Sequence, residues 1–227
     1  MDFFIMYGLT IIALVLTVGA QMYITSSYRK YKEVKSLKGM TGFEVARHIL
    51  DKNGLEKIYV VETEGTLTDH YDPANKVVRL STDVFHGDSI ASVSVAAHEC
   101  GHAIQDKEDY EFMRIRSAIV PFANISSYGG YIAILLGVIF SMMSLIWLGI
   151  LAEIVILLFQ LVTLPVEIDA SRRALSELET EKILKESELQ DSKTMLTAAA
   201  LTYVASVAAS VLELVRLILI FGRNDER

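Results

Sequence analysis

The residues best suited to chemistry lie in one short motif, H-E-x-x-H, made by His98, Glu99 and His102. On an α-helix, residues i and i+4 lie about 40° apart on the same face, so both imidazoles could bind one ion. Glu99 would lie about 100° round from His98, where its carboxylate could reach a water molecule on that ion. Two histidine ligands and a carboxylate base are the set that metal-assisted peptide hydrolysis requires.

This motif also occurs by chance in ordinary helices, so its setting decides its interpretation. The segment Val95–Gln105 lacks proline and is rich in small and aliphatic residues, and Gly87–Ser89 before it offers a turn and an N-cap. Four small residues would let other groups approach the motif: Ala96, Ala97, Gly101 and Ala103. Cys100 would lie about 200° from His98 and pack as a small core residue. We therefore predict a helix that carries a zinc site.

The composition indicates a membrane protein. Hydrophobic residues make up 52% of the 227 residues, more than in an ordinary soluble domain, and they are concentrated in blocks. The net charge is −7, and no basic tract stands clear of the membrane flanks, so nucleic acid is not an expected partner. The single cysteine excludes an internal disulfide and fits a reducing compartment.

Four apolar segments are long enough to cross a hydrocarbon layer of about 30 Å. They lie at about residues 3–24, 117–143, 145–165 and 195–221. The first segment lacks a positive n-region and is too long for a signal peptide, so we interpret it as an anchor. Basic residues between positions 29 and 38 follow it, so the positive-inside rule places residue 30 onward in the cytoplasm.

The sequence therefore predicts a mainly α-helical integral membrane protein with about four transmembrane helices and a small α+β cytoplasmic domain. The expected parts are a transmembrane anchor (1–26), a cytoplasmic domain with the H-E-x-x-H helix (27–116), a transmembrane hairpin (117–166), a cytoplasmic helix (167–194) and a transmembrane helix with a short tail (195–227). The tail, Gly222–Arg227, should lie outside. Both cytoplasmic parts fall on one side, so a carboxylate after the third span could meet the H-E-x-x-H helix.

A short amphipathic helix is expected near the start of the cytoplasmic domain, at Lys38–Asn53. Thr41 would cap it, Glu44 would complete a capping box, and Asn53–Gly54 would end it.

A small sheet should follow that helix. A strand is expected at Lys57–Val61, and a β-hairpin at Leu67–Tyr71 and Lys76–Ser81, whose last strand leads into the H-E-x-x-H helix. One sheet edge could pair with an extended peptide substrate, or the sheet could only brace the helix.

A catalytic zinc ion takes three protein ligands and leaves one position for water. Glu167 is the predicted third ligand because it begins a charged segment, expected as a helix over Glu167–Asp191, where membrane and cytosol meet. Asp169 is the rival, but two residues on a helix differ by about 200° and cannot face one ion equally. Asp169 could instead orient a histidine or pair with Arg172 or Arg173.

At these residues the sequence resembles the YugP-type bacterial membrane zinc metallopeptidases, a neutral zinc metallopeptidase family. The resemblance covers nearly the whole chain and rests on the anchor and on Leu67–Pro73, Arg79–Ser81, Val95–Gln105 and Leu164–Ala174. The family is similar to the HtpX-like and CAAX-processing membrane peptidases, which take a glutamate ligand from a later helix. The resemblance implies a zincin-like cytoplasmic domain, a Zn²⁺ cofactor and endopeptidase activity. Those relatives carry an aspartate four residues after the ligand glutamate, where this chain has Ser171.

Together these features predict a multi-pass zinc endopeptidase of the bacterial plasma (cell) membrane, with its active site facing the cytoplasm. Glu99 would take a proton from a zinc-bound water and pass it to the leaving amine. The candidate oxyanion donors are His70, Tyr71, His86 and Arg173. Expected partners are the lipid bilayer and a protein or peptide substrate. A membrane-protein substrate, a membrane-protein partner and a homo-oligomer all stay open.

Two other functions fit parts of the sequence. A catalytically idle scaffold or partner subunit could keep zinc for structure, but it would not need Glu99. A transport role could use the charged residues of the apolar spans, Glu153, Glu213 and Arg216, but spans without broken helices argue against it. Counting depth along the spans predicts that Glu153 pairs with Arg216.

Overall fold

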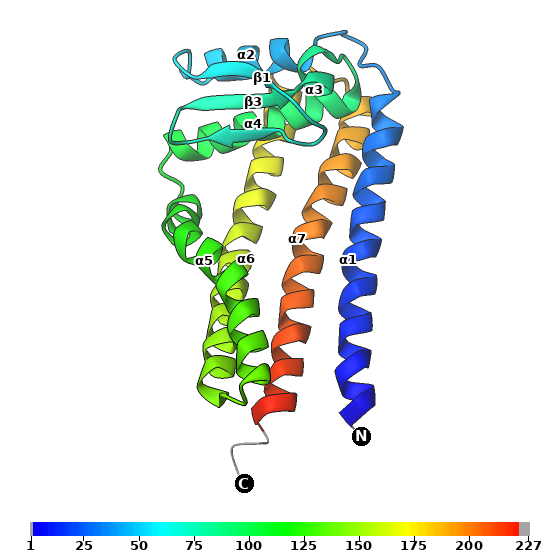
Figure 1. Cartoon of the computed structure of the whole chain (residues 1–227). Coiled ribbons are helices and arrows are strands. Elements are labelled where there is room, and N and C mark those ends of the chain that lie inside the picture. Colours follow the sequence, from blue (N-terminus) through cyan, green and yellow to red (C-terminus); the bar gives the residue numbers. More distant parts are fainter. Residues whose placement is uncertain (1, 223–227) are drawn as a thin grey trace. The chain divides into compact units, whose positions relative to one another are not determined.

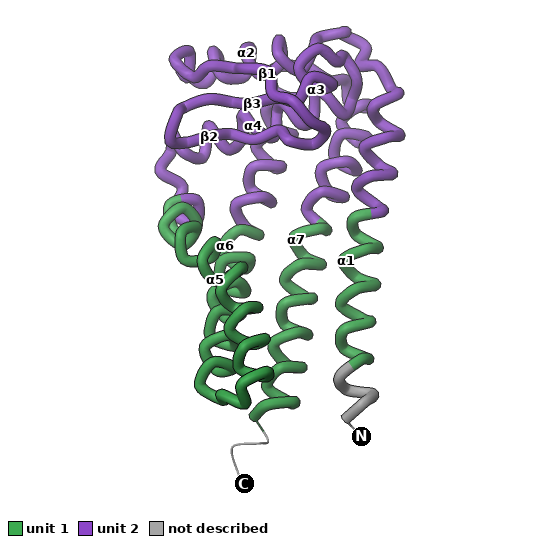
Figure 2. Tube along the Cα trace, in the orientation of Figure 1, with its two compact units in different colours: residues 1–21, 114–164, 201–227 green, residues 22–113, 165–200 purple. Residues whose placement is uncertain are grey.

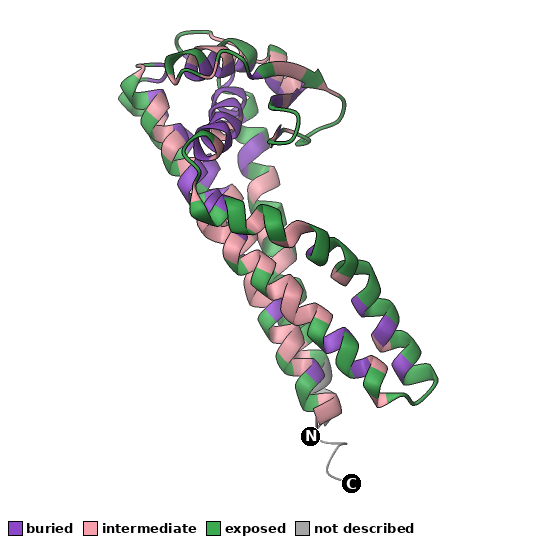
Figure 3. Cartoon of the chain, turned by 90° about the vertical axis from the view of Figure 1, so that its left-hand side faces the viewer, coloured by how far each residue is buried: buried purple, intermediate pink, exposed green. Residues whose placement is uncertain are grey.

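The computed structural model describes residues 2–222 and divides the chain into two compact units (Figures 1 and 2). The helical unit comprises residues 1–21, 114–164 and 201–227, and the mixed unit comprises residues 22–113 and 165–200. The predicted outer tail lies outside the described residues except for Gly222. Figure 3 shows that buried residues gather in the mixed unit, whereas most residues of the long helices are exposed or intermediate.

Within the described residues, four helices are long and apolar enough to cross a membrane, as predicted. They are α1 (Asp2–Lys32), α5 (Glu111–Ile139), α6 (Met143–Thr180) and α7 (Glu186–Phe221).

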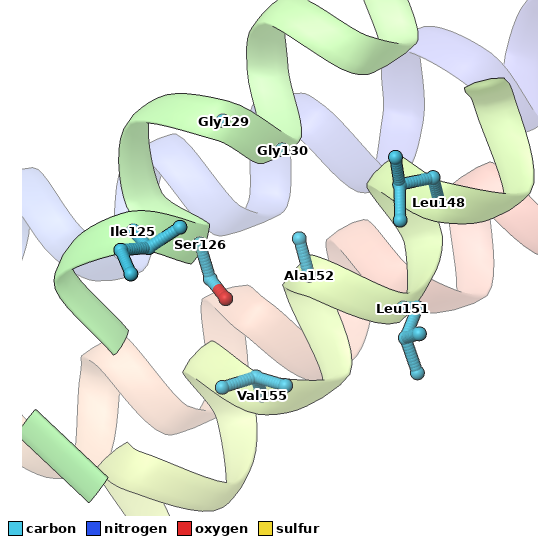
Figure 4. Close-up of a pocket in the computed structure, with 8 residues that line it drawn as sticks. All are labelled: Ile125, Ser126, Gly129, Gly130, Leu148, Leu151, Ala152 and Val155. Atoms are coloured by element: carbon cyan, nitrogen blue, oxygen red, sulfur yellow. The ribbon is translucent and has the colours of Figure 1, made fainter. Parts of the chain in front are cut away.

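Glycines allow α5 and α6 to pack closely in the helical unit. A Cβ atom added to Gly130 would lie 2.9 Å from the Cβ of Ala152, and one added to Gly149 would lie 2.8 Å from the Gly130 oxygen. Small residues at such positions let two membrane helices approach each other. Beside this contact the pair forms an apolar groove of about 250 Å³ (Figure 4).

The charged residues within the apolar helices pair differently from the prediction. Arg216 forms an ion pair with Glu213, three residues earlier on α7, and the Ser210 hydroxyl donates to Glu153. The predicted pair of Glu153 with Arg216 is therefore wrong. Residues three apart on a helix are already neighbours, so Arg216 reaches a carboxylate without crossing to another helix.

The mixed unit contains three shorter helices and one sheet. The helices are α2 (Gly42–Lys52), α3 (Thr82–His86) and α4 (Ile90–Lys107), and the strands are β1 (Tyr59–Thr63), β2 (His70–Asp72) and β3 (Val77–Ser81). The central strand β3 is antiparallel to β2, as the predicted hairpin requires, and parallel to β1. Both β1 and β2 are therefore edge strands.

Helix α4 lies at the centre of this unit, because 14 of its 18 residues are buried. The short helix α3, which precedes it, was not predicted: β3 was expected to lead directly into the H-E-x-x-H helix. Five residues are too few to show a helical period, and Ser81 at the N-cap of α3 makes no capping side-chain hydrogen bond.

Helix α2 begins at Gly42, directly after the predicted N-cap Thr41 and four residues after the expected start at Lys38, and it ends before Asn53–Gly54 as predicted. The Thr41 hydroxyl accepts a hydrogen bond from the Glu44 N–H at 3.2 Å, and the Glu44 carboxylate accepts one from the Thr41 N–H at 2.8 Å, so the capping box is complete. Gly54 follows the helix with φ of 66°, a conformation that favours glycine.

The separate charged helix predicted at Glu167–Asp191 is wrong. Helix α6 continues through Pro165 to Thr180, and α7 begins at Glu186. The chain turns where Lys182 adopts φ of 53° and the Ile183 N–H donates to the Leu178 oxygen at 2.9 Å. This is a Schellman ending without its usual glycine, and proline costs a helix one hydrogen bond without always ending it.

The capping box yields a prediction about stability. The change Thr41→Ala removes the acceptor for the Glu44 N–H, so we expect the mixed unit to lose about 1 kcal/mol of unfolding free energy. Thermal unfolding in detergent measures this loss. The control is Thr66→Ala at an exposed position, and equal unfolding temperatures for the two variants would contradict the prediction.

Candidate metal centre

The H-E-x-x-H motif lies in the second half of α4, which starts at the predicted N-cap. The Ser89 hydroxyl accepts a hydrogen bond from the Ser92 N–H at 3.1 Å. Cys100, within the motif, is fully buried, and its sulfur lies 3.6 Å from the Ala46 oxygen, in agreement with a packing role.

The second element of the site is the part of α6 that belongs to the mixed unit. It passes so close to α4 that a Cβ atom added to Gly101 would lie 2.5 Å from the Ala170 oxygen. Gly101 lies between the two histidines, and Glu167 lies one turn before Ala170. The close approach of the two helices therefore brings the Glu167 carboxylate to the histidines.

The three predicted ligands come together around one point. The Oε2 atom of Glu167 lies 3.3 Å from Nε2 of His98 and 3.6 Å from Nε2 of His102. Among the described residues, these three form the one group of histidine, cysteine and carboxylate side chains whose ligand atoms all lie within 4.8 Å of one another. Asp169, the rival ligand, is not part of it.

The donor set and its spacing fit zinc. Two imidazole nitrogens and one carboxylate oxygen are ligands that catalytic zinc accepts, with a fourth position left for water. A tetrahedral ion with bonds of about 2.0–2.1 Å holds its ligand atoms about 3.3–3.4 Å apart. The two separations from Glu167 are close to this value, and all three ligand atoms lie within 4.8 Å of one another.

Each histidine ring is also held from behind, at its Nδ1 atom. The Ser171 hydroxyl lies 3.2 Å from Nδ1 of His98, and Oε1 of Gln105 lies 3.0 Å from Nδ1 of His102. These contacts turn both Nε2 atoms towards Glu167. The sequence reasoning missed Gln105, although its position three residues after His102 on a helix placed it beside that ring.

Asp169 contacts arginines, as predicted, and reaches a histidine only indirectly. Its Oδ2 atom accepts from Nε of Arg173 at 2.6 Å and from Nε2 of Gln105 at 2.9 Å, and its Oδ1 atom accepts from Arg172. Asp169 is therefore linked to His102 through the amide of Gln105.

Burial and charge shift the ionisation of the motif residues. Burial raises the pKa of Glu99, although His98 and His102 oppose the shift. Burial alone would lower the pKa of His102, but the carboxylate of Glu167 outweighs it and the pKa is raised. A carboxylate whose pKa is raised towards neutral pH is a more effective general base than an ordinary surface glutamate.

Each of the four predicted oxyanion donors is held by another group. The partners are the Thr68 oxygen for His70, Asp106 for Tyr71, Glu62 for His86, and Asp169 with Glu108 for Arg173. The oxyanion role of these side chains stays a prediction.

Comparison with known proteins assigns the chain to a class. It matches the family model described as "Putative neutral zinc metallopeptidase" over residues 6–222, so the chain belongs to this family, as the resemblance implied. It is also 44% identical over 219 residues to "Putative membrane protease YugP" of Bacillus subtilis (strain 168), an alignment that covers 96% of this chain and 97% of that protein. No solved structure matches the chain significantly.

The contact at Gly101 gives a test of the site's geometry. The change Gly101→Ala places a Cβ atom 2.5 Å from a backbone oxygen of α6, so the helices must separate. We expect a loss of about 1–3 kcal/mol in stability and weaker zinc binding, because Glu167 moves away from the histidines. Thermal unfolding and competition with a chelator measure the two effects.

The matched control is Gly129→Ala, also within a helix, where an added Cβ atom meets nothing within 4 Å. This change should leave zinc binding intact and cost no stability, since alanine is the better helix former. Equal zinc affinities for the two variants would show that the distance between α4 and α6 does not determine how well the three ligands bind zinc.

Proposed function

We propose that this chain is an integral-membrane zinc endopeptidase that cleaves peptide bonds at the cytoplasmic membrane face. The observation that carries the proposal is the meeting of His98, His102 and Glu167 around one point, with the carboxylate of Glu99 buried beside it. Membership of the neutral zinc metallopeptidase family supports it. A purely structural zinc site would use four protein ligands and would need no base.

The residues have distinct roles in the proposed reaction. His98, His102 and Glu167 would hold a zinc ion, which when bound would polarise a peptide carbonyl and acidify a water molecule. Glu99 accepts the proton of the attacking water and returns it to the amine that leaves. Ser171 and Gln105 hold the imidazole rings in place.

An extended substrate would bind best along β2. This strand is a sheet edge, and it is tied directly to α4 because the Tyr71 hydroxyl donates to Oδ2 of Asp106 at 2.6 Å. An unpaired strand edge offers backbone groups to a peptide in extended conformation. A substrate would then need to be locally unfolded, as it is in a loop or a terminal segment.

The catalytic proposal is tested by Glu99→Gln. The amide has nearly the same shape but cannot accept the proton, so the variant should bind about one zinc ion per chain and cleave an unstructured protein at least about 100-fold more slowly. Metal content and cleavage are measured on purified full-length chains in detergent.

Each outcome of that comparison is informative. Zinc in both proteins with no cleavage by either would favour the idle scaffold or point to a missing partner. Cleavage by Glu99→Gln at the wild-type rate would remove Glu99 from the mechanism. Absence of zinc in the wild type would overturn the proposal.

The proposed orientation in the plasma membrane has its own test. Basic residues in the last turn of α1, Arg29, Lys30 and Lys32, support a cytoplasmic mixed unit. In a Cys100→Ala background, a cysteine at the exposed Thr66 should react with an impermeant thiol reagent only after cells are opened. A cysteine at the exposed Ser144, in the first turn of α6, should react in intact cells. The reverse pattern would invert the topology.

A further inference from the structure

A chain of hydrogen bonds begins at Nδ1 of His102, the ring atom that faces away from Glu167. The numbers of donors and acceptors in this chain determine which group donates in each bond. Its central member is Gln105, which is fully buried. The Nε2 atom of Gln105 lies 2.8 Å from the Val166 oxygen and 2.9 Å from Oδ2 of Asp169, and its Oε1 atom lies 3.0 Å from Nδ1 of His102.

The amide of Gln105 has one satisfactory orientation. An amide nitrogen carries two hydrogens and an amide oxygen carries none. The Val166 carbonyl and the Asp169 carboxylate are both acceptors, so they use the two hydrogens of the nitrogen. A flipped amide would place its oxygen against these two acceptor oxygens and turn two hydrogen bonds into repulsive contacts, which costs more than the loss of one hydrogen bond.

The orientation of the amide determines the state of the histidine. Since Oε1 of Gln105 can only accept, Nδ1 of His102 must carry a proton and donate it. The neutral ring then has its lone pair on Nε2, which is the atom that faces Glu167. Serine behind His98 imposes no such choice, because a hydroxyl can either donate or accept.

Asp169 holds the amide in this orientation. Its Oδ2 atom also accepts from Nε of Arg173 and its Oδ1 atom accepts from Arg172, so three donors surround the carboxylate. The arginines keep Asp169 as an acceptor. The amide therefore cannot reverse without breaking contacts at both ends.

We infer that Gln105 and Asp169 are positioning residues that fix the tautomer of His102, so that this ring always offers its Nε2 lone pair to a metal ion. The inference rests on the proposed zinc site. The group that contacts the His102 ring is the neutral amide of Gln105. The charged carboxylate of Asp169 contacts that amide and does not contact the ring. Removal of such a partner of a ligating histidine typically weakens metal binding about 10- to 100-fold.

Two full-length variants separate positioning from packing. The change Gln105→Met keeps an unbranched side chain of similar volume but removes the acceptor. The double change Gln105→Glu with Asp169→Asn keeps an acceptor for His102 and the same net charge. The new amide at position 169 can donate to the new carboxylate, and Arg173, which loses its acceptor at position 169, keeps its contact with Glu108. Both variants remove the hydrogen bond from position 105 to the Val166 oxygen, and only Gln105→Met removes the acceptor for Nδ1 of His102.

Zinc affinity by chelator competition and thermal unfolding of the zinc-free protein are measured for both variants and the wild type. We expect Gln105→Met to bind zinc about 10- to 100-fold more weakly and the double variant to stay within about threefold of the wild type. Ser192→Ala, which removes a buried hydrogen bond to Ser94 away from the histidines, should lower stability without changing zinc affinity.

The inference is overturned if Gln105→Met keeps the wild-type zinc affinity, or if a folded double variant binds as weakly as Gln105→Met. If Gln105→Met does not fold, the double variant decides alone: a tenfold loss while folded overturns the inference, and wild-type affinity supports it. A wild type that binds no zinc would instead overturn the proposed function.

Discussion

The close approach of α4 and α6 is the constraint on which the candidate site depends. Gly101 has no side chain, so the backbone of α6 at Ala170 can approach α4 to a distance that any Cβ atom would prevent. The histidines lie on either side of this glycine along α4, and Glu167 lies one turn away from the contact on α6. Glu167, which follows His102 by 65 residues in the sequence, thus comes together with two histidines that lie one helical turn apart on α4.

The close approach of α4 and α6 also buries ionisable side chains, which are usually exposed to solvent. Glu99, His102 and Glu167 are all buried, and an isolated buried charge is costly. Part of the compensation comes from Glu167 itself, which lies between the two imidazoles. The rest comes from the Gln105 and Ser171 contacts, which satisfy the far sides of the rings. Buried ionisable groups of this kind are found mainly at sites of binding or catalysis.

The sequence predicted the features that carry a recognisable local signal and missed those that carry none. The pairing of His98 with His102 follows from helical spacing alone, and the end of α2 is marked by a glycine at position 54. The turn between α6 and α7 carries no such mark, because Lys182 occupies the left-handed position with φ of 53°. The role of Gln105 was hidden because its acceptors on α6 are about 60 residues away in the sequence.

Competition between carboxylates on the same helix explains why the partner of Arg216 was assigned wrongly. A carboxylate with a cation three or four residues away on its own helix tends to pair there, as Asp169 does with Arg172 and Arg173 and as Glu213 does with Arg216. The predicted pair was based only on how deep each residue lies along its span. Depth takes no account of a nearer carboxylate on the same helix or of the direction in which a side chain points around the helix axis. The prediction therefore assigned Arg216 to the wrong carboxylate.

Glu167 and Glu153 have no basic residue at these spacings, and both find partners on another helix. In the segment after the third span, the structure agrees with this difference: Asp169 contacts its own arginines, and Glu167 contacts the histidines of α4.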